Sequence, residues 1–389
     1  MSETVTEIQS RSQVTVGVLD RLELITNNFE RGRALLELTT EASKSTDPRE
    51  LLLAHRGLER ASQAALAERP RLRHDQLLVA VIKATEPLTD ALVREAFTMP
   101  PRPADNRPEP FPGIEDITSL PRLARLEWRR AAFLANQIIN STHRSEYTAR
   151  VAEWMSRDSS HIIENVRRNQ SAIDRLPDSR ILNLQEINTL ERLADDFLVE
   201  AANIALGIER PIWKYSSLNR IAITAGESGQ FERAAQVARS IPNAEARAQG
   251  LILVAESLSR DRMRNPSDLA TQTYADAALA VTRIEQKGLR GVIAGYLVDS
   301  LISTGRFEDA RACLVLYPTE AERFVALGAI AESQGRRGSA DDARDWIARE
   351  APPAYRSALY RRVNSGVLAA ISNERQNRTR VVSPRETEE

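Results

Sequence analysis

The acidic residues that could do chemistry in this sequence recur at matched positions instead of converging on one centre. The pair Glu256-Ser257 returns as Glu332-Ser333. A glutamic acid can serve as the general acid of glycoside cleavage, but a single catalytic acid has no reason to recur in register. We therefore interpret the repeated pair as part of a structural repeat, and keep an enzyme acting on cell-wall glycan as the alternative.

Other residue types predict no catalytic or metal centre. The sequence has four scattered histidines, His55, His74, His143 and His161. None stands at ligand spacing from a cysteine or another histidine, so we predict no metal site. No glycine-rich phosphate loop or G-x-S-x-G elbow is present, so we predict no cofactor. Cys313 is the only cysteine, which excludes an internal disulfide, and we expect it to be a small buried apolar residue.

The clearest pattern is a phrase that occurs twice, GQFERAAQVARSIP at 229–242 and GRFEDARACLVLYP at 305–318. Two columns of small residues extend it in steps of 33 or 43 residues: Ala222, Ala255, Val298 and Ala331, then Ala234, Ala277, Ala310 and Ala343. The ten extra residues fall in the second unit, where we expect Asn265, Pro266 and Ser267 in a loop. This periodicity predicts four helix pairs.

Three further columns predict where each helix ends and the next begins. Gly229, Gly305 and Gly338 should end the first helix of a pair in the left-handed conformation, with Gln272 at that place in the second unit. An aromatic column follows at Phe231, Tyr274 and Phe307, and Pro242, Pro318 and Pro352 should stop the second helix. The turn and stop signals therefore agree with the alanine spacing.

These units resemble the tetratricopeptide repeat, although their second helices are shorter and the opening tryptophan of that family is absent. The resemblance covers about residues 215–350, a third of the chain. It implies a right-handed superhelix whose groove, on the first helix of each pair, receives peptides or protein segments.

The resemblance places nine residues, all but one of them polar, in that groove. They are Asn219, Ile223, Glu227, Glu256, Arg260, Asp299, Ser303, Glu332 and Arg336. Three acids in one column make one wall acidic, so the groove should accept a basic or mixed protein segment. The alternative is that these charges only keep a helix face hydrated.

The rest of the chain is helical without a visible repeat. We predict an N-terminal helical bundle at 14–98, with helices broken at Pro48, Pro70 and Pro87. A proline-rich linker at 99–121 should form a domain boundary, and a long-helix region should follow at 122–210. The repeats with a capping helix should occupy 211–372, and a disordered tail 373–389. An apolar seam over 181–208 requires a long partner helix, either the helix at 122–142 or a second copy of the chain.

The charge and hydropathy of the chain limit which kinds of partner and which cellular compartment we expect. The 53 basic residues include only four lysines, but 54 acidic residues leave a net charge of -1, so we do not expect nucleic acid as a partner. We interpret Arg122, Arg125, Arg129 and Arg130 as a solvated helix face. No stretch of 18 apolar residues and no secretory signal is visible, which favours the cytoplasm and leaves an exported mature chain open.

We therefore expect an all-α protein: an αα-hairpin repeat solenoid, tetratricopeptide-like, in the C-terminal half, preceded by an irregular α-helical region. The first functional hypothesis is a non-enzymatic scaffold or adaptor that holds a protein segment. The alternative is an all-α enzyme or accessory subunit for cell-wall glycan or nucleic acid, with its chemistry in 122–210. The sequence does not indicate an oligomeric state.

Overall fold

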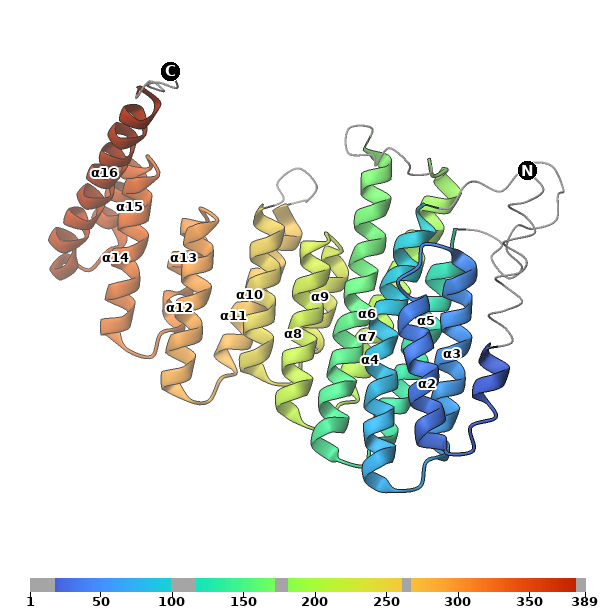
Figure 1. Cartoon of the computed structure of the whole chain (residues 1–389). Coiled ribbons are helices and arrows are strands. Elements are labelled where there is room, and N and C mark those ends of the chain that lie inside the picture. The colour runs from blue at the N-terminus through green and yellow to red at the C-terminus, as the bar shows by residue number, and fades with distance from the viewer. Residues whose placement is uncertain (1–17, 99–116, 172–180, 261–266, 383–389) are drawn as a thin grey trace, which may run out of the picture. The chain divides into compact units, whose positions relative to one another are not determined.

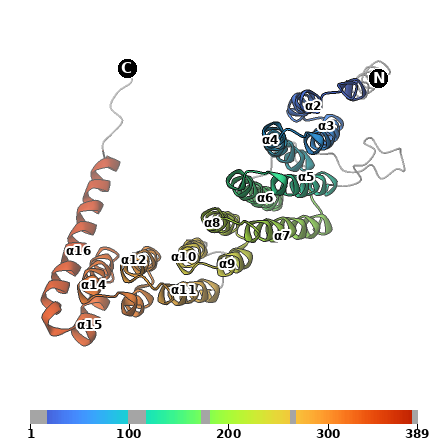
Figure 2. The same ribbon diagram turned by 90° about the horizontal axis from the view of Figure 1, so that it is seen from below.

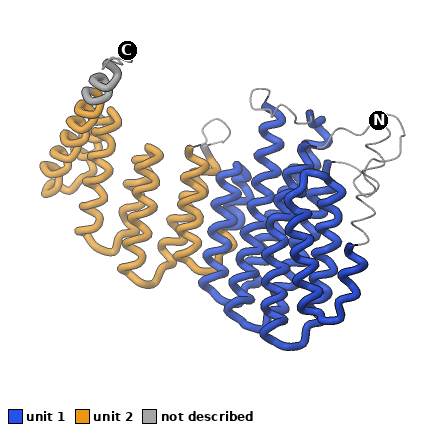
Figure 3. The backbone as a smooth tube through the Cα atoms, viewed as in Figure 1, with its two compact units in different colours: residues 1–237 blue, residues 238–389 orange. Residues whose placement is uncertain are grey.

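A computed structural model describes residues 18–98, 117–171, 181–260 and 267–382, and these residues form helices and no strand. The predicted all-α class is confirmed. The chain divides into two compact units, residues 1–237 and 238–389 (Figure 3). No helix of the described part is long and apolar enough to cross a membrane.

The division between the units does not fall at the proline-rich segment. Most of that segment, 99–116, lies outside the described residues. The helices on either side of it, α4 (Arg71–Ala96) and α5 (Ser119–Gln137), pack against each other within the first unit. The predicted domain boundary at 99–121 is therefore wrong, and the boundary lies between residues 237 and 238, inside a helix of the repeats.

The first unit is a stack of helix pairs in two layers. Besides α4 and α5 it contains α2 (Asn28–Ala42), α3 (Pro48–Ala67), α6 (Ser141–Gln170), α7 (Leu184–Leu206), α8 (Pro211–Glu227) and the start of α9 (Phe231–Ser240). The even-numbered helices α2, α4, α6 and α8 contact one another in turn and form one row, and the odd-numbered helices form the other (Figures 1 and 2). The region predicted to be irregular therefore also consists of stacked helix pairs.

Two helices of this unit run through predicted breaks. Pro87 lies inside α4, and α6 continues for 30 residues, although two shorter helices are expected from the sequence, at 145–157 and 160–175. The apolar seam of α7 packs mainly along α6, where the hydroxyl of Ser159 donates to the carbonyl of Ala194 (2.7 Å). The seam therefore has an intramolecular partner, but that partner is α6 and not the helix at 122–142.

The second unit has the regularity that the sequence predicts. Its first layer contains α10 (Ala244–Arg260), α12 (Lys287–Ser303) and α14 (Glu320–Arg336), each 17 residues long, and α16 (Pro353–Val382). The second layer contains α11 (Ser267–Thr282), α13 (Phe307–Ala312) with the short 3₁₀ helix η1 (Cys313–Leu316), and α15 (Ala340–Glu350). Figure 2 looks along these helices and shows the two rows.

The predicted turn and packing signals are found in the helices. Gly229, Gly305 and Gly338 adopt φ of 74°, 78° and 84°, which only glycine reaches without strain. The two small-residue columns are buried, and α9, η1 and α15 each end two residues before the predicted proline. Cys313 is half-buried, and burial raises its thiol pKa to about 11, so the unreactive thiol is the dominant form at neutral pH.

The second repeat differs from the prediction. Helix α11 already begins at Ser267, so Ser267 is helical and Gln272 lies within the helix instead of at a turn. Asn265 and Pro266 lie outside the described residues. At least part of the insertion therefore lengthens the second helix of this pair.

One turn joins second helices to first helices in both units. The fourth residue of α6, α10 and α14 is an arginine that donates to the carbonyl six residues earlier: Arg144 to Ile138 (3.1 Å), Arg247 to Ile241 (2.9 Å) and Arg323 to Tyr317 (3.2 Å). Carbonyls at a helix C-terminus lack intrahelical donors, so the arginine satisfies them and fixes the turn. This contact extends the repeat to the α5–α6 turn, which lies outside the predicted array.

The end of the second unit is closed by α16. Leu359 and Val363 are buried as predicted, and a Cβ on Gly335 would overlap the Val363 carbonyl, so α14 and α16 approach closely. The helix continues to Val382, so the prediction of disorder from residue 373 is wrong up to that point. Residues 383–389 lie outside the described part.

Candidate functional site

One side of α10, α12 and α14 carries an acid at the same position of each helix, preceded by exposed apolar residues. We call this surface the A face. It is formed by Gln249, Leu253, Glu256 and Arg260 on α10, by Val292, Tyr296, Asp299 and Ser303 on α12, and by Val325, Ala329, Glu332 and Arg336 on α14. Within each helix these residues are three or four apart and so lie on one side.

The N-terminal half of the A face is apolar and open to solvent. Leu253 is 42% exposed, Val292 52%, Tyr296 56% and Val325 71%. Neighbouring exposed apolar side chains on adjacent helices form a patch, which is a mark of interaction sites on soluble proteins. The acidic column follows one turn further along α10 and α12, and two turns beyond Val325 on α14.

A pocket of about 480 Å³ lies between α10 and α12. Its lining combines apolar side chains with the predicted polar ones: Gln249, Ile252, Leu253, Glu256, Tyr296, Asp299, Ser300 and Ser303. The structure therefore brings three of the predicted groove residues, Glu256, Asp299 and Ser303, to one cavity. Their role in binding stays a prediction.

The three acids of the A face differ in their partners. Glu256 pairs with Arg260 (2.5 Å), and Glu332 pairs with Arg336 (3.0 Å) and Arg362 (3.1 Å). Among the described residues no cation lies within ion-pair distance of Asp299. Partial desolvation by its surroundings raises the pKa of Asp299 above the usual value for an aspartate.

A second pocket, of about 430 Å³, lies between α14 and α16. It is lined by Phe324, Val325, Gly328, Ala358, Leu359, Arg361, Arg362 and Ser365. Val325 belongs to the A face, so the apolar surface continues towards the last helix. The predicted residues Glu332 and Arg336 lie on the same side of α14 but do not line this pocket.

The remaining predicted residues, Asn219, Ile223 and Glu227, lie on α8 in the first unit. Glu227 is exposed and Ile223 is half-buried. The amide oxygen of Asn219 is buried and has no hydrogen-bond partner. Asn219 therefore does not offer that oxygen to a ligand on the surface, contrary to its predicted role as a polar groove contact.

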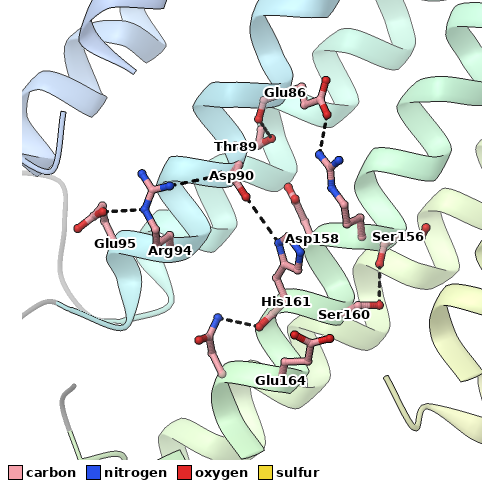
Figure 4. A network of polar contacts seen from close by, with 12 residues as sticks. Glu86, Thr89, Asp90, Arg94, Glu95, Ser156, Asp158, Ser160, His161 and Glu164 are labelled. Atoms are coloured by element: carbon pink, nitrogen blue, oxygen red, sulfur yellow. Dashed lines mark hydrogen bonds and ion pairs between the residues drawn. The ribbon is translucent and has the colours of Figure 1, made fainter. Parts of the chain in front are cut away.

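The first unit holds a different polar cluster, at the contact of α4, α5 and α6 (Figure 4). The carboxylate of Asp158 is fully buried; Trp128 Nε1 donates to Oδ2 (2.7 Å), and Oδ1 has no partner. Beside it His161 pairs with Asp90 (3.6 Å) and Arg157 with Glu86 (2.8 Å). The cluster thus links three helices through side-chain contacts.

Burial controls the ionisation of this cluster. It raises the pKa of Asp158 to about 7, although the Trp128 hydrogen bond acts in the opposite direction. The Asp90 hydrogen bond raises the pKa of His161, and the same contact lowers the pKa of Asp90. Because Asp158 has no exposed surface, it is placed to affect helix packing and not to reach a substrate. Among the described residues no group of three or more His, Cys, Asp or Glu side chains could hold a metal ion.

Several of the many arginines form ion pairs between neighbouring helices. Arginines of the odd-numbered helices pair with acids of the neighbouring odd-numbered helix: Arg125 with Glu200 (2.9 Å), Arg129 with Glu200 (2.5 Å), Arg233 with Asp195 (2.7 Å), Arg239 with Asp276 (2.7 Å) and Arg311 with Glu350 (3.6 Å). Arg125 and Arg129, which we expect on a solvated face, therefore serve as contacts between helices.

No protein-family model and no curated protein matches this chain. Solved structures do match it. One, described as a "Circular tandem repeat protein with novel repeat topology and enhanced subunit contact surfaces", is 14% identical over 95% of this chain and 90% of its own, with a TM-score of 0.44. Another, described under "Computational Design of Self-Assembling Cyclic Protein Homooligomers", is 15% identical over 90% and 98%, with a TM-score of 0.25. The stacked helix pairs of the structure itself make the chain a helical repeat protein.

The exposed apolar column of the A face is the functional feature that sequence reasoning missed. Leu253 and Tyr296 occupy equivalent positions one turn before the acids, and Val292 and Val325 occupy equivalent positions two turns before them. An apolar residue that recurs on the solvent side of a helix was the available signal. The alanine columns mark only the buried side of these helices.

Proposed function

We propose that the protein is a non-enzymatic scaffold whose A face binds a protein segment. The observation that carries the proposal is the presence of exposed apolar side chains on three successive helices of the second unit, each followed by an acid one or two turns further along the helix. Hydrophobic burial is the main favourable term in association, and fully burying a large apolar side chain contributes about 1.5–3 kcal/mol. Leu253, Tyr296 and Val325 together therefore offer enough apolar surface for a specific contact.

Two further features support this proposal. The tetratricopeptide resemblance implies ligand binding on the first helix of each pair, and the A face consists of first helices. Two of the three A-face helices, α10 and α14, are also held at their first turns by Arg247 and Arg323, which favours a surface that is formed before the ligand arrives. A preformed surface lowers the entropic cost of binding.

The test is selection of peptides from a random phage-displayed library on the full chain. Leu253→Glu and Val325→Glu should each abolish capture of the selected peptides. Leu279→Glu is the matched control, because Leu279 is 52% exposed but lies on α11 in the second layer. If no peptide is selected, or if capture survives both A-face changes, the proposal is wrong.

A further inference from the structure

We propose that the pocket between α10 and α12 receives an arginine or lysine side chain of the bound segment, flanked there by apolar side chains. The inference rests on the proposed function and names the chemistry of the segment. It follows from a difference between the three repeats that form the A face.

Only the middle repeat lacks the arginine that neutralises the acid. Arg260 and Arg336 stand four residues after Glu256 and Glu332 and pair with them, whereas Ser303 stands four residues after Asp299. A serine side chain is too short to replace an arginine, and its hydroxyl donates to the Ser300 carbonyl (2.8 Å). The repeat thus presents a carboxylate whose counter-charge is missing from its own helix.

Neighbouring repeats do not supply that charge either. Arg337 reaches α12 from the following repeat, but it donates to the carbonyl of Ser303 (2.5 Å) and its guanidinium lies over the ring of Phe307. Arg362 is occupied by Glu332 (3.1 Å). Asp299 is therefore open to a cation from outside the chain.

The lining of the pocket suits the side chain of a basic residue. Ile252, Leu253 and the exposed ring of Tyr296 offer apolar surface for its methylene groups, and Asp299 supplies the unpaired carboxylate. The face of the Tyr296 ring also attracts a cation. An apolar or acidic side chain in this pocket would leave the Asp299 carboxylate desolvated and unpaired, which is unfavourable.

The experiment compares two replacements of Ser303, with peptides selected on the unmodified full chain. Ser303→Arg restores the i, i+4 pair of the neighbouring repeats, a change that favours the helix by about 0.2–0.5 kcal/mol and so preserves folding. It should weaken peptide binding about tenfold, which corresponds to about 1.4 kcal/mol. Ser303→Gln adds comparable bulk without charge and should leave binding within about twofold. Asp299→Asn should match Ser303→Arg.

The selected peptides provide the second readout. They should share one arginine or lysine with apolar neighbours, and changing that residue to norleucine should weaken binding to the unmodified chain but not to Asp299→Asn. Peptides that require Leu253 and Val325 but carry no basic residue, or that bind Ser303→Arg unchanged, overturn this inference and leave the proposed function standing. Capture that does not depend on Leu253 and Val325 removes both.

Discussion

The two units use charged residues in opposite ways. In the first unit the carboxylates of Glu127 and Asp158 are completely buried, and Glu68 and Glu95 are nearly so. In the described part of the second unit no charged residue is buried to that degree, and the acids of α10, α12 and α14 lie on the A face. Buried polar groups hold helices in one arrangement, whereas exposed ones are available to a partner.

The difference indicates a division of roles. Glu127 joins α5 to α3 through His55 and also accepts from Arg130 of its own helix, and Asp158 joins α5 to α6 through Trp128. Such contacts favour a single packing. On the A face, no cation among the described residues forms a comparable contact with the carboxylate of Asp299. We therefore propose that the first unit supports the fold and that the second unit carries the recognition surface.

The largest predicted effect is a contrast between two glutamates. Glu127→Ala removes the buried partner of Arg130 and His55, so it should destabilise the first unit by about 3–5 kcal/mol. Glu332→Ala removes the half-buried partner of two exposed arginines, Arg336 and Arg362, and should cost at most about 1 kcal/mol. Urea unfolding followed by hydrogen exchange reports the two units separately. Equal losses in the free energy of unfolding for the two variants would contradict the proposed difference between the units.

The next effect is a pH dependence confined to the first unit. Asp158 has a pKa of about 7 when folded and 3.8 as its model value, so the folded state binds its proton more tightly. Its contribution to stability is present below about pH 4 and is lost as the pH rises through about 7, by at most about 4 kcal/mol at about 1.4 kcal/mol per pKa unit.

Asp158→Asn tests this pH dependence, because the amide keeps an acceptor for Trp128 but does not titrate. Thermal unfolding of both chains between pH 4 and pH 8 gives the difference that belongs to Asp158, since Asp90, Arg157 and His161 are unchanged. The unmodified chain should lose stability relative to Asp158→Asn as the pH rises. Parallel curves would show that Asp158 does not govern the pH dependence.

A packing change should affect the second unit through the α14–α16 contact. Gly335→Ala places a Cβ against the Val363 carbonyl, so α16 must shift, at a cost of about 1–3 kcal/mol. Gly288→Ala is the control, because a Cβ there meets no atom within 4 Å. Hydrogen exchange should increase in α14 and α16 for the first variant only. Unchanged exchange would mean that the close contact contributes little to stability.

The smallest effect should be the same in both units, because the arginine turn is common to them. Arg144→Ala and Arg247→Ala each leave helix carbonyls without a donor, and each should cost about 1–2 kcal/mol. Arg260→Ala removes only an exposed i, i+4 pair and should cost about 0.3–0.5 kcal/mol. Measured by urea unfolding, a loss at Arg247 alone would show that the turn matters only in the regular repeats.

The sequence predicts the second unit well because its first-layer helices α10, α12 and α14 have one length. Constant 17-residue helices put Gly305 and Gly338, and Ala310 and Ala343, at constant intervals. Helices of the first unit vary from 15 residues in α2 to 30 in α6, so the same stacking leaves no period. The arginine turn was the remaining signal: Ile138 and Arg144 stand six residues apart, like Ile241 and Arg247.

The candidate site could be predicted only in part. Repeat spacing aligns Glu256, Asp299 and Glu332, but it does not show which acid has a partner, because pairing depends on the residue four places later and on the next helix. Burial of the Asn219 oxygen is likewise a tertiary property. The cluster around Asp158 could not be predicted from the sequence, because Asp90, Trp128 and Asp158 come together only when α4, α5 and α6 pack.

Photo-crosslinking tests the central claim most directly. A selected peptide carrying benzoylphenylalanine beside its basic residue is irradiated with the full chain, and the crosslinked residues are identified by mass spectrometry. The account predicts crosslinks on α10 and α12 around Leu253 and Tyr296, lost when Ser303 is changed to arginine. Crosslinks confined to the first unit, or to α11, α13 and α15, would contradict it.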